Sequence, residues 1–525
     1  MLQNPAIVRF CCDFGAYKPP ISPAIFNPPN KSALLSATTP KNFSSEKNCA
    51  KISFDQNGTT KRGMKMSTQL PNQSNALKAI ANPSKSFFIA MLTRDIDLVD
   101  CMLDLLDNTV DGINSMAKRN EIVLDEEKPY HGFSVDITFD RSHFSIKDKS
   151  GGIPIDVATD YAFRFGRPDF APDLLDGSIG LYGIGMKRAI FKIGNLVSIQ
   201  SSTGFESFNV DLDVEKWRQN QQLRDDVEGN EVMEWSFDLT NVQTNGTDVE
   251  IGTIIRVEEL YEGIYRQFEN PIFQDRLNKM IARDYAFILN QGLTVRVNGV
   301  EIAPIMPKFL QSSEIAPFQH VEICDGVRIE ITVGFAEPPP SDTSATARNP
   351  DVGVYGWYVV CNDRVVVSAD KSADTGWGIK PVPAWHPQYI GFMGVVRFES
   401  SDPRKLPWKT TKRDVEASNA FYQRALPVMM RATKKLTDYT NARRLEAKRL
   451  KRIENAAVAK PVSRIIVNVP VKLPEVDQGE FVMIEYAREM SDVRAAAETL
   501  GIVGGSPSEV GIRTFEYYFA REVAK

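Results

Sequence analysis

The sequence is poor in the residue types that most often bind transition metals. It contains six cysteines, none in a Cys-x-x-Cys pair, and four histidines, none grouped at metal-ligand spacing. This scarcity argues against a zinc site, a disulfide framework and histidine-based metal chemistry. The chain also lacks an apolar run of about 18 residues, so we expect no membrane span. A reducing, cytoplasmic setting fits these absences.

The sequence also lacks a large excess of charge of one sign. Its net charge is −5, and its content of 42% hydrophobic and 25% charged residues is typical of a globular protein. This balance argues against a protein whose whole surface coats nucleic acid, although it is compatible with a local basic patch. At roughly 150 residues per domain, the length predicts about three domains.

The first 63 residues have few acidic side chains and no hydrophobic periodicity. They are rich in Pro, Ser, Asn and Lys, and they contain no apolar segment of a secretory signal. We therefore expect residues 1–63 to be disordered or not part of the fold. An organellar presequence is one alternative. An over-long start is another, because Met64 and Met66 directly precede the organised sequence.

The stretch 100–114 has the periodicity of an amphipathic helix, with acidic residues and one asparagine along one face. Like charges one turn apart repel by roughly 0.2–0.5 kcal/mol per pair, so helix stability does not favour this arrangement. It suits a divalent cation and an attacking water, and a solvated acidic face is the alternative. The polar face holds Asp100, Asp104, Asp107, Asn108 and Asp111, and the apolar face holds Val99, Met102, Leu103, Leu106, Val110 and Ile113.

Two glycine-rich segments follow this helix. The first comes after predicted strands at 133–139 and 144–146, where Asp148 precedes a tight turn with paired glycines. The second, residues 180–188, precedes an amphipathic stretch at 189–193. A glycine-rich loop that opens a helix offers free N–H groups to a polyphosphate. The second loop is neither a Walker A motif, since Met-Lys follows its last glycine, nor a dinucleotide fingerprint.

The remainder of the chain is predicted to alternate strands, helices and polar loops. Residues 419–454 are predicted to form one long helix whose segment 443–452 carries six basic residues and one acidic residue. Residues 481–525 follow the strand–helix–helix order of ribbon-helix-helix DNA binders, with a dimerisation or packing module as the alternative. Here we expect a strand at 481–486, a helix at 491–500 and a last helix capped by Ser506. Further expected strands lie at 196–201, 208–212, 254–257, 293–297, 327–335, 355–367 and 390–398, with a helix at 274–290 and polar loops at 164–179 and 337–350.

Together, the order and spacing of four motifs resemble the sequence boxes of the GHKL ATPase superfamily. This superfamily includes gyrase B subunits, MutL, ninety-kilodalton heat-shock chaperones, sensor histidine kinases and MORC proteins. The resemblance runs from about residue 85 to 445 and is nearest to MORC-like and related prokaryotic members, because of the glycine loop and the segment Cys361-Asn-Asp-Arg364. The boxes are Asp104-x-x-x-Asn108-x-x-Asp111-Gly112, Asp148-x-x-x-Gly152, Gly180-x-x-Gly183-x-Gly185-x-Lys187 and Gly252-Thr253.

The resemblance implies an α+β fold in which a Bergerat-type α/β sandwich binds ATP. The ATP-binding domain would span residues 64–265, and a transducer-type β-α domain would span 266–445. The end of a basic helix and a linker would occupy 446–470, and a small strand–helix–helix module would occupy 471–525. The segment Leu406-Pro-Trp-Lys-Thr-Thr-Lys412 resembles the transducer loop of the family.

The resemblance also implies a role for each site residue. Asn108 would hold Mg²⁺ against the phosphates of ATP, and Asp148 would accept the adenine amino group. Gly152 would let the base approach, and the Thr253 hydroxyl would support Asp148. The remaining residues would face the phosphates: Gly180, Gly183 and Gly185 through their N–H groups, Lys412 from the second domain, and Lys187 as an additional contact unless it points outward from its helix.

Two positions depart from the family pattern. Asp104 stands where the family has a glutamate general base, and a displacement of about 1 Å in a catalytic group can cost on the order of 10²-fold in rate. Hydrolysis is therefore expected to be slow, or to draw on Asp107 or Asp111. Ser150 replaces the first glycine of the adenine-site box, which most turn geometries tolerate. We therefore expect ATP binding to be retained and ATP turnover to be slow.

The sequence leaves several functions to compare. The first is an ATPase that dimerises on ATP, changes conformation and acts on DNA, as MORC-like proteins would, or on a protein client. A chaperone-like ATPase is a second, although only about 80 residues follow the transducer-like region. An ATP-binding scaffold with very slow or no turnover is a third. A sensor histidine kinase is excluded, because residues 1–130 contain no histidine.

Overall fold

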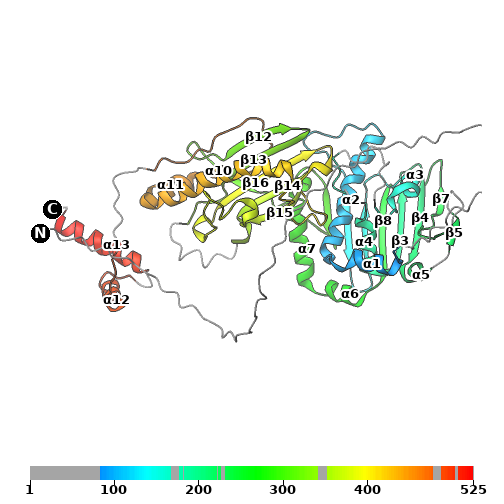
Figure 1. Cartoon of the computed structure of the whole chain (residues 1–525), viewed down its shortest axis with the longest axis horizontal. Helices are drawn as coiled ribbons and strands as arrows, with labels where there is room; N and C mark the ends of the chain where they lie inside the picture. The colour runs from blue at the N-terminus through cyan, green and yellow to red at the C-terminus, as the bar shows by residue number, and fades with distance from the viewer. Residues whose placement is uncertain are drawn as a thin grey trace, which may run out of the picture. The chain divides into compact units, whose positions relative to one another are not determined.

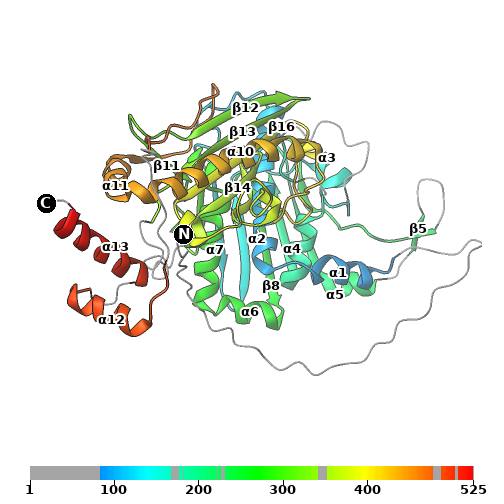
Figure 2. The same cartoon turned by 60° about the vertical axis from the view of Figure 1, so that its left-hand side comes forward.

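The computed structural model describes most of the chain, and the described residues belong to two compact units. The larger unit lies within residues 83–481, and the smaller unit includes the described residues from 486 onward (Figures 1 and 2). The predictions for residues 1–63 and for the strand at 481–486, apart from Tyr486, lie outside the described residues, as do parts of the loops at 164–179 and 337–350. The described residues are 83–166, 177–180, 183–220, 223–225, 231–340, 352–476, 486–502 and 506–523.

The larger unit contains a mixed eight-stranded sheet. All neighbouring strands in it are antiparallel except β1 and β9, which run parallel. The strands predicted at 133–139, 144–146, 196–201, 208–212, 254–257 and 293–297 are confirmed. In sheet order the strands are β10 (Val300–Glu301), β9 (Thr294–Val297), β1 (Ser134–Phe139), β2 (His143–Asp148), β8 (Gly252–Leu260), β3 (Gly194–Ser202), β4 (Ser207–Asp213) and β7 (Thr240–Gln243).

Helix α2 (Leu98–Arg119) confirms the predicted amphipathic helix and extends it at both ends. It begins at the N-cap Asp97, whose carboxylate accepts a hydrogen bond from the Val99 N–H at 3.2 Å. Its apolar face is buried in the core with the sheet strands. Helix α4 (Gly185–Ile193) packs on α2, and α1 (Lys85–Arg94) packs on α4. In Figure 1 these helices lie beside the strands of the eight-stranded sheet.

A second sheet of five strands follows in the chain. Helix α10 (Ala420–Ala442) packs on β13 and β16, and Figure 2 shows it crossing in front of this sheet. Helices α7 (Pro271–Asp284) and α8 (Ala286–Asn290) contact β15, and the helix predicted at 274–290 is divided between them at Tyr285. One hydrophobic core includes residues of both sheets. In sheet order the strands are β12 (Phe318–Cys324), β13 (Val327–Phe335), β16 (Phe392–Ser400), β14 (Gly356–Cys361) and β15 (Arg364–Asp370).

The prediction of a single long helix at 419–454 is wrong in one respect, because the helix is broken after Ala442. A 3₁₀ turn at Arg443–Glu446 separates α10 from α11 (Ala447–Ala456). The Arg443 side chain is only 1% exposed because its guanidinium forms a buried ion pair with Glu454. The Tyr439 hydroxyl also donates to Glu454, at 2.8 Å. One of the six basic residues predicted for a DNA-binding surface therefore lies inside the protein.

The described part of the smaller unit consists of two helices and a final π-helical turn, Phe519–Val523. Helices α12 (Met490–Thr499) and α13 (Pro507–Tyr518) confirm the predicted pair. The Ser506 hydroxyl accepts a hydrogen bond from the Glu509 N–H at 3.2 Å, as the capping pattern predicts. Residues 486–502 and 506–523 carry six acidic and four basic side chains, so these helices add no basic surface.

The larger unit contains several shorter elements. The shorter elements are α3 (Ile155–Val157), a π-helical turn (Ala158–Ala162), α5 (Val214–Gln219), α6 (Glu262–Phe268) and the strand pairs β5 (Leu223–Asp225) with β6 (Glu231–Met233) and β11 (Lys308–Gln311) with β17 (Val458–Pro461).

Among the described residues, no helix is both long and apolar enough to cross a membrane.

Candidate functional site

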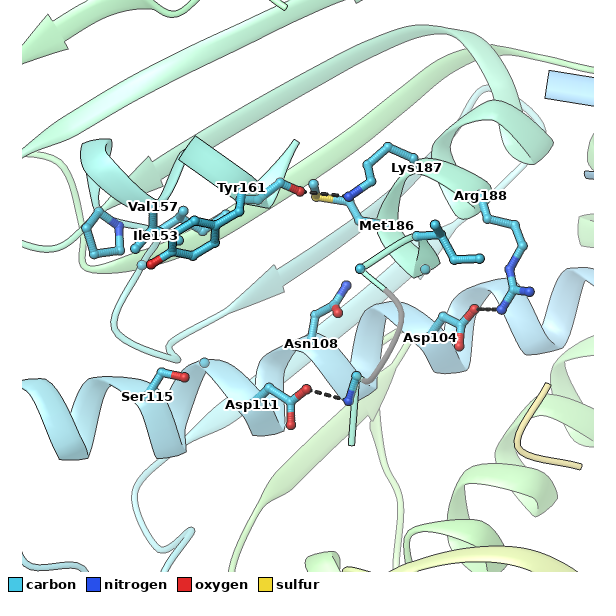
Figure 3. Close-up of a pocket in the computed structure, with 18 of the residues that line it drawn as sticks. Asp104, Asn108, Asp111, Ser115, Ile153, Val157, Tyr161, Met186, Lys187 and Arg188 are labelled. Atoms are coloured by element: carbon cyan, nitrogen blue, oxygen red, sulfur yellow. Dashed lines mark hydrogen bonds and ion pairs between the residues drawn. The ribbon is translucent and has the colours of Figure 1, made fainter. Parts of the chain in front are cut away.

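A cavity of about 230 Å³ lies between α2, the start of α4 and the segment 152–162 (Figure 3). Residues that are far apart in the sequence line it, including Asp104 on α2 and Lys412 from the loop after β16. Eight of the ten predicted site residues are in its lining, whereas Asp148 and Thr253 are not. The eight are Asp104, Asn108, Gly152, Gly180, Gly183, Gly185, Lys187 and Lys412.

One face of α2 forms a wall of the cavity. Asp104, Asn108, Asp111 and Ser115 follow one another at helical spacing and point to the same side (Figure 3). Asn108 is exposed, although residues 101–107 and 109–110 around it are buried. Its side-chain amide is therefore accessible from the cavity.

Asp104 is engaged by two cations. One carboxylate oxygen pairs with the Arg188 guanidinium, and the other lies 3.5 Å from the Lys412 ammonium. Helix α4 approaches closely here, because a Cβ added to Gly185 would lie 3.2 Å from the Cβ of Asp104. A glycine at 185 thus allows Arg188, one turn further along α4, to reach the carboxylate. Each oxygen of Asp104 is therefore in contact with a cation in this arrangement.

Lys412 is held in an unusual backbone conformation. Its φ is +53°, a region that non-glycine residues rarely adopt and that costs of order 1–3 kcal/mol when the surroundings impose it. Its ammonium lies 2.6 Å from Asp107 Oδ2. Burial alone would lower the pKa of Lys412, but the charges of Asp107 and Asp104 raise it above its usual value. Lys412 therefore stays protonated inside the protein.

Behind Lys412 lies a buried ionic network that the sequence analysis did not predict. The Tyr285 hydroxyl donates to Asp107 at 2.5 Å, and Arg364 Nε donates to Asp107 at 3.3 Å. The Arg364 guanidinium also stacks over the Tyr285 ring at 4.3 Å. Burial raises the pKa of Asp107, but Lys412 and Arg364 outweigh it and lower that pKa. Asp107 is thus committed to ion pairs and is not placed to act as a general base.

Lys187 is the least compensated cation of the cavity. It is 2% exposed, which excludes the outward position considered for it. Its ammonium donates to the carbonyl oxygen of Ala162 at 2.8 Å, and the described residues provide no carboxylate partner. Burial lowers the pKa of Lys187 to about 7. An anionic ligand in the cavity would supply the charge that this site lacks.

Asp111 fixes the start of the glycine segment. Its two oxygens accept hydrogen bonds from the N–H groups of Ile179, at 2.7 Å, and Gly180, at 2.6 Å. The Gly180 N–H is therefore occupied, which corrects the prediction that it would face a phosphate. Burial raises the pKa of Asp111 to about 6, although the two N–H groups counteract this effect. Beyond this anchor, α4 begins without a side-chain cap, so its N-terminal N–H groups face the cavity end.

Asp148 lies at the edge of this site. Its Oδ1 accepts hydrogen bonds from the Ser150 N–H and hydroxyl, at 2.9 and 2.5 Å, and from the Thr253 N–H at 3.3 Å. The predicted support from the Thr253 hydroxyl is wrong, because that hydroxyl bonds with Ser201 Oγ at 3.1 Å. Burial raises the pKa of Asp148. Gly152 lines the cavity, and a Cβ there would overlap the carbonyl oxygen of Ser202.

The described side chains that line the cavity do not by themselves form a complete metal-binding site. Within the described ranges, no group of three or more His, Cys, Asp or Glu side chains could hold a metal ion. A cation would therefore need oxygens from a bound ligand in addition to the Asn108 side chain. Mg²⁺ commonly binds in this way, through few protein ligands, waters and substrate phosphates.

Comparison of the chain with models of known protein families and with curated proteins gives no match.

Proposed function

We propose that this chain binds Mg²⁺–ATP in the α2–α4 cavity and hydrolyses it slowly, as a GHKL-type ATPase of the MORC-like kind. The proposal includes the finer architecture that the resemblance implies, namely a Bergerat-type sandwich followed by a transducer-like domain. Its support is that eight residues chosen from the sequence, spread from position 104 to 412, line one cavity.

The observation that carries the proposal is the buried Lys187, for which the described residues provide no carboxylate partner. A buried ammonium without a carboxylate partner costs free energy, as its pKa of about 7 indicates. Such a cost is typical of sites that bind a charged ligand. The uncapped N-terminus of α4 and the nearby Lys412 and Arg188 add positive potential to the same cavity. A triphosphate provides the negative charge that these groups favour.

The polar residues suggest how the cofactor and base would be held. Asn108 is exposed to the cavity and offers the amide oxygen that Mg²⁺ accepts as a ligand. Bound Mg²⁺ would neutralise phosphate charge during transfer. We place the adenine toward Gly152, with Asp148 as the acceptor for its amino group, because the described residues donate one long hydrogen bond to Asp148 Oδ2, from Thr109 at 3.5 Å.

Turnover would require Asp104 to change partners. As general base it must accept a proton from the attacking water, but its oxygens contact Arg188 and Lys412. Phosphate oxygens would compete for both cations and so release the carboxylate. Lys412 would then stabilise the charge that develops on the transferred phosphoryl group. ATP-dependent homodimerisation is part of the proposal, and DNA is a proposed partner, although Arg443 of the basic segment is buried.

A second candidate is an ATP-binding scaffold that turns over very slowly or not at all. The double ion pairing of Asp104 favours it, because the shorter aspartate would have to leave two cations before it could activate water. The two candidates share the binding site and differ only in the chemical step.

Calorimetric titration of the full chain with ATP, with and without Mg²⁺, tests the proposal. We expect saturable binding that requires Mg²⁺ and that weakens at least tenfold in Lys187→Met, since a charge-assisted contact contributes about 1.5–3 kcal/mol. The matched control is Lys192→Met on the same helix, because Lys192 also donates to a carbonyl, that of Thr93 at 2.8 Å, but lies outside the cavity lining. Absence of ATP binding by the wild-type chain would refute the proposal. Size measurements with a non-hydrolysable analogue test dimerisation.

A further inference from the structure

The short segment 177–180 is fixed at both ends by different parts of the fold. At its start, the Gly177 N–H donates to the carbonyl oxygen of Ser401 at 2.9 Å. The side-chain amide of Asn362 donates to the carbonyl oxygen of Gly177 at 3.1 Å. At its end, Asp111 accepts the N–H groups of Ile179 and Gly180. The segment therefore connects the five-stranded sheet to α2.

Asn362 is well placed to act as the anchor from the second sheet. It is the first residue of the two-residue turn between β14 and β15, where Asn362 and Asp363 have φ values of +45° and +63°. Asparagine tolerates this left-handed conformation better than most residues do. Its side chain makes two further bonds to Ser400, donating to the carbonyl at 3.1 Å and accepting from the N–H at 3.0 Å. Three hydrogen bonds to backbone groups of Gly177 and Ser400 thus fix the side-chain amide of Asn362.

The other end of the segment forms part of the cavity wall. Gly180 lines the cavity, and a Cβ added there would lie 2.7 Å from Asp111 Oδ2 and 3.8 Å from Asn108 Oδ1. Gly180 therefore lies beside the amide that would hold Mg²⁺. The Ile179 side chain between the two ends is 1% exposed and belongs to the core. A displacement at Gly177 would reach Gly180, because the buried Ile179 limits how the intervening residues can adjust.

The strand that follows this turn makes a second connection to the site. Arg364, the first residue of β15, donates to Asp107, and Asp107 in turn holds Lys412. The turn and the first residue of β15 thus contact the segment 177–180 and the ionic network behind Lys412, respectively. The segment Cys361-Asn-Asp-Arg364, which stood out in the sequence without an assigned role, supplies both contacts.

We propose that Asn362 is a positioning residue for the phosphate end of the cavity, acting through the segment 177–180 and Asp111. The inference rests on the proposed function. It adds a path between the second sheet and the nucleotide that does not pass through Lys412. Loss of the Asn362 side chain should weaken binding of the triphosphate and leave binding of the nucleoside monophosphate unchanged.

The test compares Asn362→Gly with Asn298→Gly in the full chain. Both asparagines occupy the first position of a turn with positive φ, and both side chains accept or donate hydrogen bonds, but Asn298 contacts Phe139 and Gln274 away from the cavity. We expect Asn362→Gly to weaken Mg²⁺–ATP binding about tenfold, with AMP binding changed less than twofold, since one of the three side-chain hydrogen bonds that the variant loses is the bond to Gly177. Asn298→Gly should change neither. Asn362→Asp replaces the side-chain NH₂ donor by an oxygen that would face the carbonyl oxygens of Gly177 and Ser400. This variant should show the same selective loss of Mg²⁺–ATP binding.

Hydrogen exchange of the Ile179 and Gly180 amides provides a readout without nucleotide. We expect exchange at these amides to accelerate in Asn362→Gly and Asn362→Asp, and to stay at the wild-type rate in Asn298→Gly. Wild-type exchange and ATP binding in both Asn362 variants, or an equal loss of ATP and AMP binding, would overturn the inference. Failure of the wild-type chain to bind ATP would instead refute the proposed function, even if the exchange result held.

Discussion

The ammonium of Lys412 lies 2.6 Å from the carboxylate of Asp107, although 305 positions separate the two residues in the sequence. The contact joins the loop after β16 to α2 at the wall of the cavity. Asp104 and Asp107 together face three cations, Arg188, Arg364 and Lys412. Arg364 also pairs with Asp284, at 3.6 Å, so the three carboxylates of this cluster balance its three cations, and an anionic ligand close to Asp104 would compete with these carboxylates.

Replacing Lys412 by methionine should destabilise the fold substantially. The change leaves Asp107 and Asp104 buried with one cation fewer, and breaking a buried pair typically costs about 3–5 kcal/mol. We expect a loss near 3 kcal/mol in the free energy of unfolding by urea, because Arg364 still pairs with Asp107. Lys409→Met in the same loop is the control, since the Lys409–Asp414 pair is exposed and worth at most about 1 kcal/mol. Equal losses in the two variants would contradict a structural role for the Lys412 contact.

Lys187 should take up a proton when ATP binds. With a pKa of about 7, it is largely neutral at pH 8 in the free protein, and a nearby triphosphate would raise that pKa and restore the charge. Calorimetric titrations at pH 8 in buffers of different ionisation enthalpy should show net uptake of up to one proton per ATP. Lys187→Met should abolish this uptake, and Lys192→Met should keep it. Equal uptake in wild type and Lys187→Met would assign the proton to another group.

The parts of the site that follow from local sequence were predictable. The spacing of Asp104, Asn108 and Asp111 places them on one helix face, because the α-helical period fixes this from the sequence alone. The glycines at 183 and 185 likewise mark the start of α4. These features depend on neighbours within a few residues, so the sequence pattern contains them.

The parts that depend on long-range contacts were not predictable. Arg364 and Asp107 are 257 positions apart, and no local pattern pairs them. The break after Ala442 arises because Arg443 turns inward to Glu454, whereas its charge suggested an exposed helix face. The Thr253 hydroxyl could be assigned to Asp148 from the motif, but its actual partner, Ser201, is set by the pairing of β3 with β8.

Asp111 should make the stability of the protein depend on pH in a distinctive way. Its folded pKa of about 6 lies above the unfolded value near 3.9, so the folded state binds more protons between these values. The contribution of Asp111 to stability therefore falls as pH rises from about 4 to 6 and stays constant above. The groups that face it are Lys412, which opposes the shift, and Asp107, which adds to it.

Asp111→Asn removes this titration while keeping the size of the side chain. The free energy of unfolding of the variant, relative to wild type, should increase as pH rises from about 4.5 to 7, whatever its value at either end. Urea unfolding of both proteins at several pH values in this range measures the difference. A difference that stays constant with pH would mean that Asp111 does not titrate there in the folded protein.

Asp104→Asn separates the ATPase from the scaffold. Neutralising Asp104 frees Arg188 and Lys412 from a competing carboxylate, so ATP should bind as tightly as in wild type or more tightly. Loss of a general base should lower the single-turnover hydrolysis rate by about 10²-fold or more. Asp414→Asn is the control, because Asp414 is an exposed partner of Lys409 in the loop after β16. This substitution should leave the ATP affinity and the hydrolysis rate unchanged. Measurable and equal rates in wild type and Asp104→Asn would remove Asp104 from catalysis. Tight binding without hydrolysis in either protein would favour the scaffold, because the two cations would then hold Asp104 even when ATP is bound.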